Sequence, residues 1–337
     1  MLFFLVPLAV WLGYSRTIAS SGGLFTFTRE AAGDPLAHTQ GWIWTISYFL
    51  YLPYTVTYIV YDLLPVIFPG ITPYRWELEL LIPLAVIALA LAPLAPVLIA
   101  VGILAAVQLL LMSALGGLQL ANLGTHSGSF TRQGIGATAM AKGVGNVSLL
   151  LVCASLPLFL GGETRGRNRT IRTGLSVAFA AVAAYFLFSA FPLAYAPHAI
   201  INAPIPGVAI AQTYAGRPFA ITIGLATATS IGILILAEYI ALSRLLHAWL
   251  KLNIRNALTL IAIPFLAADA ISLTNPQGFY DQLLKPSLVA LYLSQLLVFA
   301  VYPLYNRRTT ALLPATAASA LMIYGLYTVT TNQLGLG

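Results

Sequence analysis

Residues 95–122 read APVLIAVGILAAVQLLLMSALGGLQLAN, a run without a single charged side chain. A helix needs about 20 apolar residues to cross the hydrocarbon core of a bilayer. Backbone polar groups find no water at that depth, so a segment of this kind crosses the membrane as an α-helix. The run therefore predicts a transmembrane helix.

The rest of the chain has the same character. Hydrophobic residues make up 59% of its 337 positions and charged residues 7%, whereas soluble domains carry about 25% charged residues. No stretch between the apolar segments is long enough for a soluble domain, so we expect one all-α transmembrane domain. Ten spans are predicted, near residues 2–19, 41–68, 78–93, 95–122, 144–162, 173–196, 218–246, 257–273, 286–305 and 310–331.

The cationic residues predict how the chain is threaded. A net charge of +7 could indicate a nucleic-acid partner, but retention of Arg and Lys on the cytoplasmic side during insertion explains it more simply. One set of alternate loops holds eleven cationic residues, among them Arg16, Arg29 and Arg165, and the other set holds five. We expect the richer set in the cytoplasm, both chain ends outside, and a multi-pass protein of the cell membrane in contact with lipid and not with nucleic acid.

Side chains for catalysis are dispersed. No two of the four histidines share a helix face at the spacing of metal ligands, and the single cysteine, Cys153, excludes an internal disulfide or a cysteine metal cluster. The ATP-binding pattern G-x-x-x-x-G-K-[ST] is absent. We therefore expect no catalytic residues, no bound cofactor apart from a candidate sodium ion, and a function other than that of an enzyme.

Four tyrosines follow one another in the span at 41–68. A helix of 3.6 residues per turn places them on one stripe, which consists of Tyr51, Tyr54, Tyr58 and Tyr61. Aromatic packing or a belt at the membrane surface is one interpretation, and the wall of a pocket is the other. A belt lies at the membrane surface and does not run through the centre of a span, which favours the pocket.

The span at 144–162 contains Pro157 in its second half. Proline removes a backbone donor and disfavours the helical conformation at Leu156, which leaves carbonyls near Val152 and Cys153 without partners. Unpaired backbone persists at membrane depth only where it lines a cavity or contacts a ligand. A simple kink is the alternative, but we expect a broken helix beside a cavity.

Polar groups in the span at 218–246 suggest an ion site. The carbonyl of Ala226 and the hydroxyls of Thr229 and Ser230 lie within roughly 100° of arc on consecutive turns, and such oxygens suit a hard cation. Hydroxyls also serve as ordinary contacts between membrane helices, so the pattern alone leaves both interpretations open.

Glu238 lies in the same span, about 12 Å further toward the cytoplasm than Ser230. An ionisable residue inside a span is a functional candidate by default, unless it pairs with a nearby Arg or Tyr. We expect a role for Glu238 in coupling or gating. Asp62, Glu163 and Asp269 are near span ends, where water can reach them, and are weaker candidates.

Several stretches together resemble the amino acid–polyamine–organocation (APC) superfamily. Residues 20–27, SSGGLFTF, are followed by Arg29, Gly33 and Gly41-Trp42, as in the first cytoplasmic loop of that family. The interrupted span that ends at Glu163, with its basic tail, resembles the family's sixth helix. Ser243-Arg244 resembles the end of its eighth.

The resemblance implies a LeuT-type fold of two inverted five-helix repeats, with substrate held at broken helices near the midplane. Residues 1–122 would form a truncated first repeat, 144–305 the second repeat, and 306–337 an extra C-terminal helix. The family's first helix would then be missing, and we expect a misassigned start rather than a fragment or a degenerate paralogue.

The same resemblance implies site residues. Backbone groups of the broken helix would hold the substrate, together with residues of the family's third helix; these are Val152, Cys153, Ala154, Ser155 and Leu156, and Tyr51, Tyr54 and Thr55. Ala226, Thr229 and Ser230 match the sodium site of sodium-coupled relatives, and the span at 95–122 lacks the lysine that proton-coupled relatives can use, which favours sodium over the proton.

We therefore expect a secondary active transporter for an amino acid or related amine. A non-transporting or degenerate membrane subunit of the same fold is the main alternative, and a membrane-embedded enzyme is a more remote one.

Overall fold

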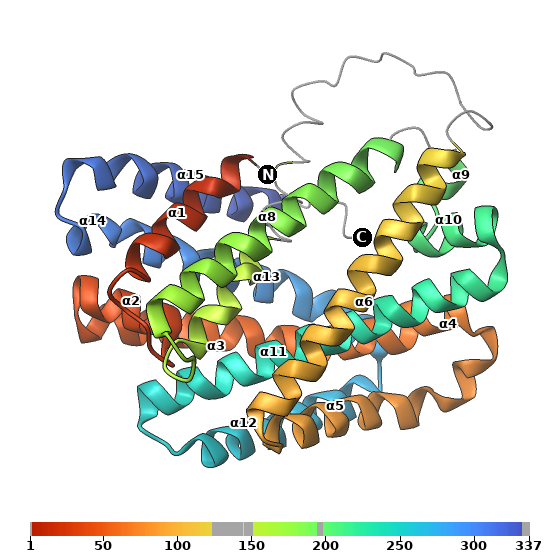
Figure 1. Cartoon of the computed structure of the whole chain (residues 1–337). Coiled ribbons are helices and arrows are strands. Elements are labelled where there is room, and N and C mark those ends of the chain that lie inside the picture. Colours follow the sequence, from red (N-terminus) through yellow and green to blue (C-terminus); the bar gives the residue numbers. More distant parts are fainter. Residues whose placement is uncertain (1, 123–143, 145–150, 194–197, 332–337) are drawn as a thin grey trace.

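The computed structural model describes residues 2–122, 144, 151–193 and 198–331 as a bundle of helices (Figure 1), and no strand occurs among these residues. The predicted all-α class is confirmed. The α-helices are α1 (Leu5–Tyr14), α2 (Gly23–Ala32), α3 (Asp34–Thr57), α4 (Leu64–Ile67), α5 (Arg75–Leu91), α6 (Leu94–Ala121), α8 (Arg167–Leu193), α9 (His198–Ile201), α10 (Pro206–Ala215), α11 (Arg217–Leu250), α12 (Ile254–Ser272), α13 (Pro276–Ala300), α14 (Tyr302–Tyr305) and α15 (Leu312–Thr330). The 3₁₀ segments are η1 (Leu2–Phe4), η3 (Pro69–Tyr74), η4 (Cys153–Leu160) and η5 (Thr309–Ala311), and η2 (Tyr58–Leu63) is π-helical.

Within the described residues, six helical stretches are long and apolar enough to cross a membrane, which indicates a multi-pass membrane protein. They coincide with six of the expected spans and are Asp34–Ile67, Leu94–Ala121, Arg217–Leu250, Ile254–Ser272, Pro276–Tyr305 and Thr309–Thr330. The span expected at 2–19 is a shorter apolar helix, and that at 78–93 is the 17-residue α5. The count of ten spans and the inverted repeats stay predictions.

Several expected spans begin earlier in the structure, and the span expected at 286–305 differs most. The one expected at 286–305 begins instead at Pro276, because Asn275 caps α13 by accepting a hydrogen bond from the backbone N–H of Gly278 at 3.1 Å. Pro286 lies inside the helix. For the span expected at 144–162, residues 145–150 lie outside the described part of the chain.

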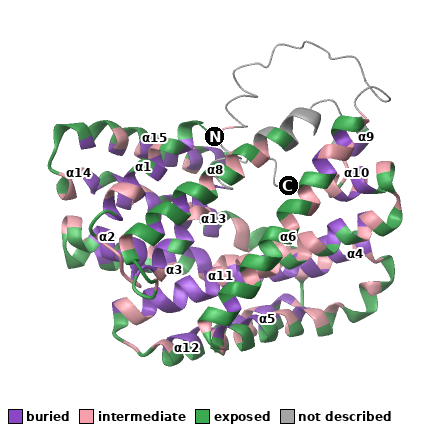
Figure 2. Cartoon of the chain, in the orientation of Figure 1, coloured by how far each residue is buried: buried purple, intermediate pink, exposed green. Residues whose placement is uncertain are grey.

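The bundle has inner and outer helices (Figure 2). In the most apolar stretch of α3 and in that of α13, 61% of the residues are buried, against 6% in α6. α3 and α13 pack along each other, and the second half of α11 joins them in the interior. α6 therefore presents its apolar side chains to lipid, while α3, α11 and α13 enclose the interior where a site can lie.

The ends of the bundle correspond to the two sets of loops that the charge count separates. Figure 1 shows α2, the start of α8, the α11–α12 connection and α14 at one end. α4, α9 and α10 lie at the other end. The first group carries the cation-rich segments, and its end is the one expected to face the cytoplasm; we call it the cytoplasmic end, and the opposite one the outer end.

α2 is a buried helix of the cytoplasmic end. It packs on α3, and Leu24, Phe25 and Phe27 are almost completely buried. Its first residue, Gly23, has φ +49°, and a Cβ atom there would lie 2.7 Å from the ring of Phe159 in η4. Glycine is required here both by the backbone conformation and by the contact.

Gly23→Ala is expected to lower the free energy of unfolding by about 2–4 kcal/mol, because it adds left-handed strain to a clash with Phe159. Denaturant unfolding of the purified protein in mixed micelles measures the change. Gly102→Ala is the matched control, since its Cβ would meet no atom within 4 Å. Equal effects of the two substitutions would contradict the role of Gly23.

Candidate functional site

The helix is interrupted at the predicted place, whereas the cavity expected beside the break stays a prediction. Leu151 and Val152 are α-helical, and from Cys153 to Leu160 the chain continues as a 3₁₀ helix. Ser155 is completely buried and donates a hydrogen bond to the carbonyl of Val152 at 3.0 Å. In turn it accepts one from the side-chain amide of Gln295 in α13, at 3.1 Å. The break is thus held in place by polar contacts from its own backbone and from an inner helix.

Glu238 lies next to this break. Its side chain is 0% exposed, and neither carboxyl oxygen has a hydrogen-bond partner. Its electrostatic neighbours are Tyr48 and Tyr51 of α3 and Cys153 of η4. We call these four residues the Glu238 cluster. The structure therefore unites the expected coupling residue with two of the expected substrate residues.

The charge of Glu238 has no counterpart in its surroundings. The described part of the chain contains two ion pairs, and neither involves Glu238. An ionised carboxylate without a partner is strongly disfavoured in an interior of low polarity. At this position the carboxyl group requires either a proton or a cationic ligand.

The other expected substrate residues surround the cluster unevenly. Val152 and Leu156 are buried, and Ala154 is half-buried beside Cys153. Thr55 donates a hydrogen bond from its hydroxyl to the carbonyl of Tyr51 at 2.7 Å, so this hydroxyl is already engaged with the backbone of its own helix. The Thr55 hydroxyl is therefore less free to meet a ligand than the half-buried Ala154.

Tyrosines link the cluster to the outer end. The rings of Tyr51 and Tyr54 are 5.5 Å apart, and Tyr54 stacks on Tyr280 of α13 at 4.5 Å. Tyr54 Oη also donates a hydrogen bond to Tyr280 Oη at 2.9 Å. Beyond this contact lies a pocket of about 200 Å³, here called the outer pocket, which is lined by Thr57, Tyr61, Asp62, Pro276, Gln277 and Tyr280. The Tyr54–Tyr280 contact therefore separates the outer pocket from the Glu238 cluster.

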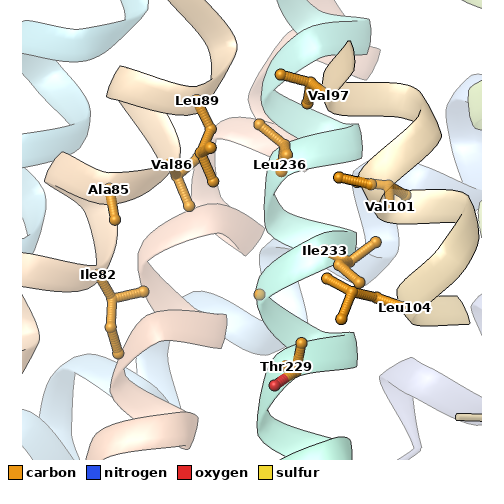
Figure 3. Close-up of a pocket in the computed structure, with 12 residues that line it drawn as sticks. Ile82, Ala85, Val86, Leu89, Val97, Val101, Leu104, Thr229, Ile233 and Leu236 are labelled. Carbon is orange, nitrogen blue, oxygen red and sulfur yellow. The ribbon is translucent and has the colours of Figure 1, made fainter. Parts of the chain in front are cut away.

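The expected sodium residues lie elsewhere. Ala226 and Ser230 are half-buried, and Thr229 lines a cavity of about 330 Å³ between α5, α6 and α11 (Figure 3). Thr229 contributes the only polar side chain among the described residues of that lining. Such a cavity suits hydrocarbon better than an ion, and sodium binding by these three residues stays a prediction.

The cytoplasmic end carries a buried ion pair. Arg244 of α11 donates two hydrogen bonds to Glu163, from Nε at 2.8 Å and from Nη2 at 3.2 Å. A third, from Nη1, reaches Ser243 Oγ at 3.0 Å. Arg244 is 4% exposed, and Glu163 follows η4 closely in the chain. The pair thus joins the end of the broken segment to α11.

Sequence reasoning missed three members of the site. Tyr48 precedes Tyr51 by one helical turn, so extending the tyrosine stripe toward the N-terminus could have found it. Gln295 and Tyr292 of α13 are fully buried, and each has an oxygen without a hydrogen-bond partner. No motif marks them; only the packing of α13 on α3 brings them to the break.

Comparison of the chain with family models and with curated proteins finds no match.

Proposed function

We propose that the chain is a secondary active transporter for an amino acid or a related amine. The observation that carries the proposal is the carboxyl group of Glu238, which is fully buried without a partner beside a non-α-helical break. Transporters of the LeuT type bind substrate in such a place, near the midplane and at interrupted helices. The resemblance to the APC superfamily supports the same assignment.

The cluster is suited to a positively charged amine. Glu238 supplies the opposite charge, and the faces of Tyr48 and Tyr51 can attract a cation. The carbonyl of Val152 already accepts a hydrogen bond from Ser155, so the ammonium group would bind at the two unpartnered carboxyl oxygens of Glu238. An amino acid or amine then satisfies groups that are otherwise buried without partners.

Charge balance gives a coupling step. In the empty site Glu238 holds a proton, and the entering ammonium group takes its place: the O–H bond of the carboxyl breaks, the proton leaves to water, and the carboxylate pairs with the ammonium. Substrate and proton thus exchange at one group. Sodium coupling through Ala226, Thr229 and Ser230 remains the alternative for the driving ion.

Two contacts are suited to alternate access. The Tyr54–Tyr280 contact closes the path from the outer pocket, and the Arg244–Glu163 pair ties the break to α11 at the cytoplasmic end. In this proposal the two open in turn, as one group of helices rocks against the other.

Counterflow in proteoliposomes tests the function. Vesicles containing the purified chain are loaded with one amino acid or aliphatic amine at a time, and uptake of the same labelled compound is followed. Accumulation for at least one compound is expected, and vesicles without protein serve as the control. Failure of every common amino acid and of a series of di- and polyamines would favour the non-transporting alternative.

Ala154→Leu is expected to reduce that counterflow at least tenfold, because the larger side chain occupies space beside Cys153 where the substrate would bind. Ala106→Leu, on the exposed face of α6, is the matched control and should transport normally. Normal transport by the Ala154 variant would indicate that the break is only a kink.

A further inference from the structure

A pair of buried carboxyl groups, separate from Glu238, lies toward the outer end, between α5 and α12, which run side by side (Figure 1). Glu79 of α5 is 0% exposed, and its Oε1 lies 2.7 Å from Thr57 Oγ1 and 2.7 Å from Ser272 Oγ. Its Oε2 has no hydrogen-bond partner. Two hydroxyl groups therefore converge on one oxygen of Glu79 and leave the other unsatisfied.

Asp269 of α12 is the second member of the pair. It is also 0% exposed, both of its carboxyl oxygens lack a hydrogen-bond partner, and Glu79 is its electrostatic neighbour. Two adjacent buried carboxylates cannot both be ionised without great cost. Three unpartnered oxygens, one from Glu79 and two from Asp269, thus require a ligand of positive charge.

The hydrogen count favours a proton as that ligand. Thr57 Oγ1 lies 3.0 Å from the carbonyl of Pro53, besides its contact with Glu79. Ser272 Oγ lies 2.7 Å from the carbonyl of Asp269, besides its own contact with Glu79. Each hydroxyl has a single hydrogen, so two hydrogens face four short oxygen–oxygen contacts. A hydrogen on Glu79 Oε1 supplies a third and leaves one contact to share a hydrogen with its neighbour, and the acid form of Asp269 removes the remaining charge.

A metal ion fits less well. Hard cations such as Ca²⁺ and Mg²⁺ take about six or more oxygen ligands. Among the described residues no group of three or more His, Cys, Asp or Glu side chains is placed to hold a metal ion. The hydroxyls of Thr57 and Ser272 are already engaged with Glu79 and with backbone carbonyls.

The outer pocket offers a path for protons. Thr57 lines that pocket and contacts Glu79, and it is followed by η2, a π-helical segment of a kind that is frequent at functional sites. Tyr61 of η2 lines the pocket too and is an electrostatic neighbour of Glu79. Water in the pocket is therefore one side chain away from the pair.

Among the described residues, no cation forms an ion pair with Glu79 or Asp269. The guanidinium of Arg75 lies 5.0 Å from the ring centre of Tyr61 and is an electrostatic neighbour of Asp62. It forms no ion pair with Glu79 or Asp269, which are both described. The other titratable side chains at this end of the surrounding elements are Tyr58, Glu77, Arg217, Tyr280, Asp281 and Lys285.

We propose that Glu79 and Asp269 form a proton-binding site that exchanges with the outer pocket through Thr57. The protonated form of the pair is present at low pH and is lost as pH rises, because deprotonation leaves negative charge on the buried carboxyl groups. Binding of the proton does not depend on transport. Its use as a driving ion rests on the proposed function.

Infrared difference spectroscopy of the purified chain in lipid nanodiscs tests the site without any substrate. The C=O stretching band of protonated carboxyl groups is recorded over a pH titration. Glu79→Gln and Asp269→Asn should each remove part of that band and alter the titration of the part that remains, while Glu77→Gln, an exposed neighbour, should leave the bands of Glu79 and Asp269 unchanged. If substitution of one carboxyl group leaves the titration of the other unchanged, the two do not form a common proton-binding site.

Two further measurements keep the proposal testable if a carboxyl variant does not fold. Thr57→Val retains both acids and should shift the frequency of the Glu79 band, since it removes a contact at 2.7 Å; an unchanged band would overturn the assignment. Addition of sodium chloride at constant pH should leave the bands intact, whereas their loss would identify a sodium site instead. Failure of counterflow with the infrared result intact would refute the transport function and leave this site standing.

Discussion

Glu238→Gln is expected to abolish proton release on substrate binding and to weaken binding of the amine roughly 30-fold or more. Removing one member of a buried charge pair costs about 2–5 kcal/mol, and each 1.4 kcal/mol is a factor of about ten in affinity. The amide keeps the volume of the side chain but can neither lose a proton nor oppose an ammonium group. Calorimetric titration in two buffers of different ionisation enthalpy, with the compound that shows the strongest counterflow, measures both quantities.

Stability separates this prediction from a general defect. Glu238 has two unpartnered carboxyl oxygens in the interior, so an uncharged side chain there should leave the free energy of unfolding unchanged or raise it. Glu77→Gln is the control, because Glu77 is exposed in the first turn of α5. A Glu238 variant that is stable and still releases one proton per bound amine would remove Glu238 from the coupling step.

The parts of the site that the sequence revealed are those governed by local chemistry. The lengths of the apolar runs predict six spans that the structure supports. Pro157 predicts the break, because the N–H that proline lacks removes a helical hydrogen bond within one turn of the same segment. Glu238 was found because an ionisable side chain within an apolar run is costly wherever it lies.

The parts that were missed depend on which helices touch. Asp269 is near the end of its span, so the sequence predicts that water can reach its side chain. The packing of α5 on α12 instead buries it completely. Glu79 is the second residue of the span expected at 78–93, two positions after the exposed Glu77, and no motif in the sequence marks it. Their pairing joins segments 190 positions apart, and hydropathy carries no information on such contacts.

The second large effect concerns the ion pair at the cytoplasmic end. Arg244→Met should lower the free energy of unfolding by about 2–4 kcal/mol, somewhat less than the loss of a fully enclosed pair, because the side chain of Glu163 is 25% exposed. Methionine keeps much of the length of arginine, so the loss reflects the two hydrogen bonds to Glu163 and the carboxylate left behind. Denaturant unfolding in mixed micelles gives the value.

A double-mutant cycle decides whether the pair itself is responsible. The double variant Arg244→Met, Glu163→Gln should be more stable than Arg244→Met alone, because the unpaired carboxylate is gone. Arg29→Met is the matched control: its partner Glu30 is 3.8 Å away and both side chains are largely exposed, so a change within about 1 kcal/mol is expected. If both arginines cost the same, or if the double variant loses the sum of the single effects, the contact does not tie the broken segment to α11. The cytoplasmic closure in the transport proposal would then need another pair of residues.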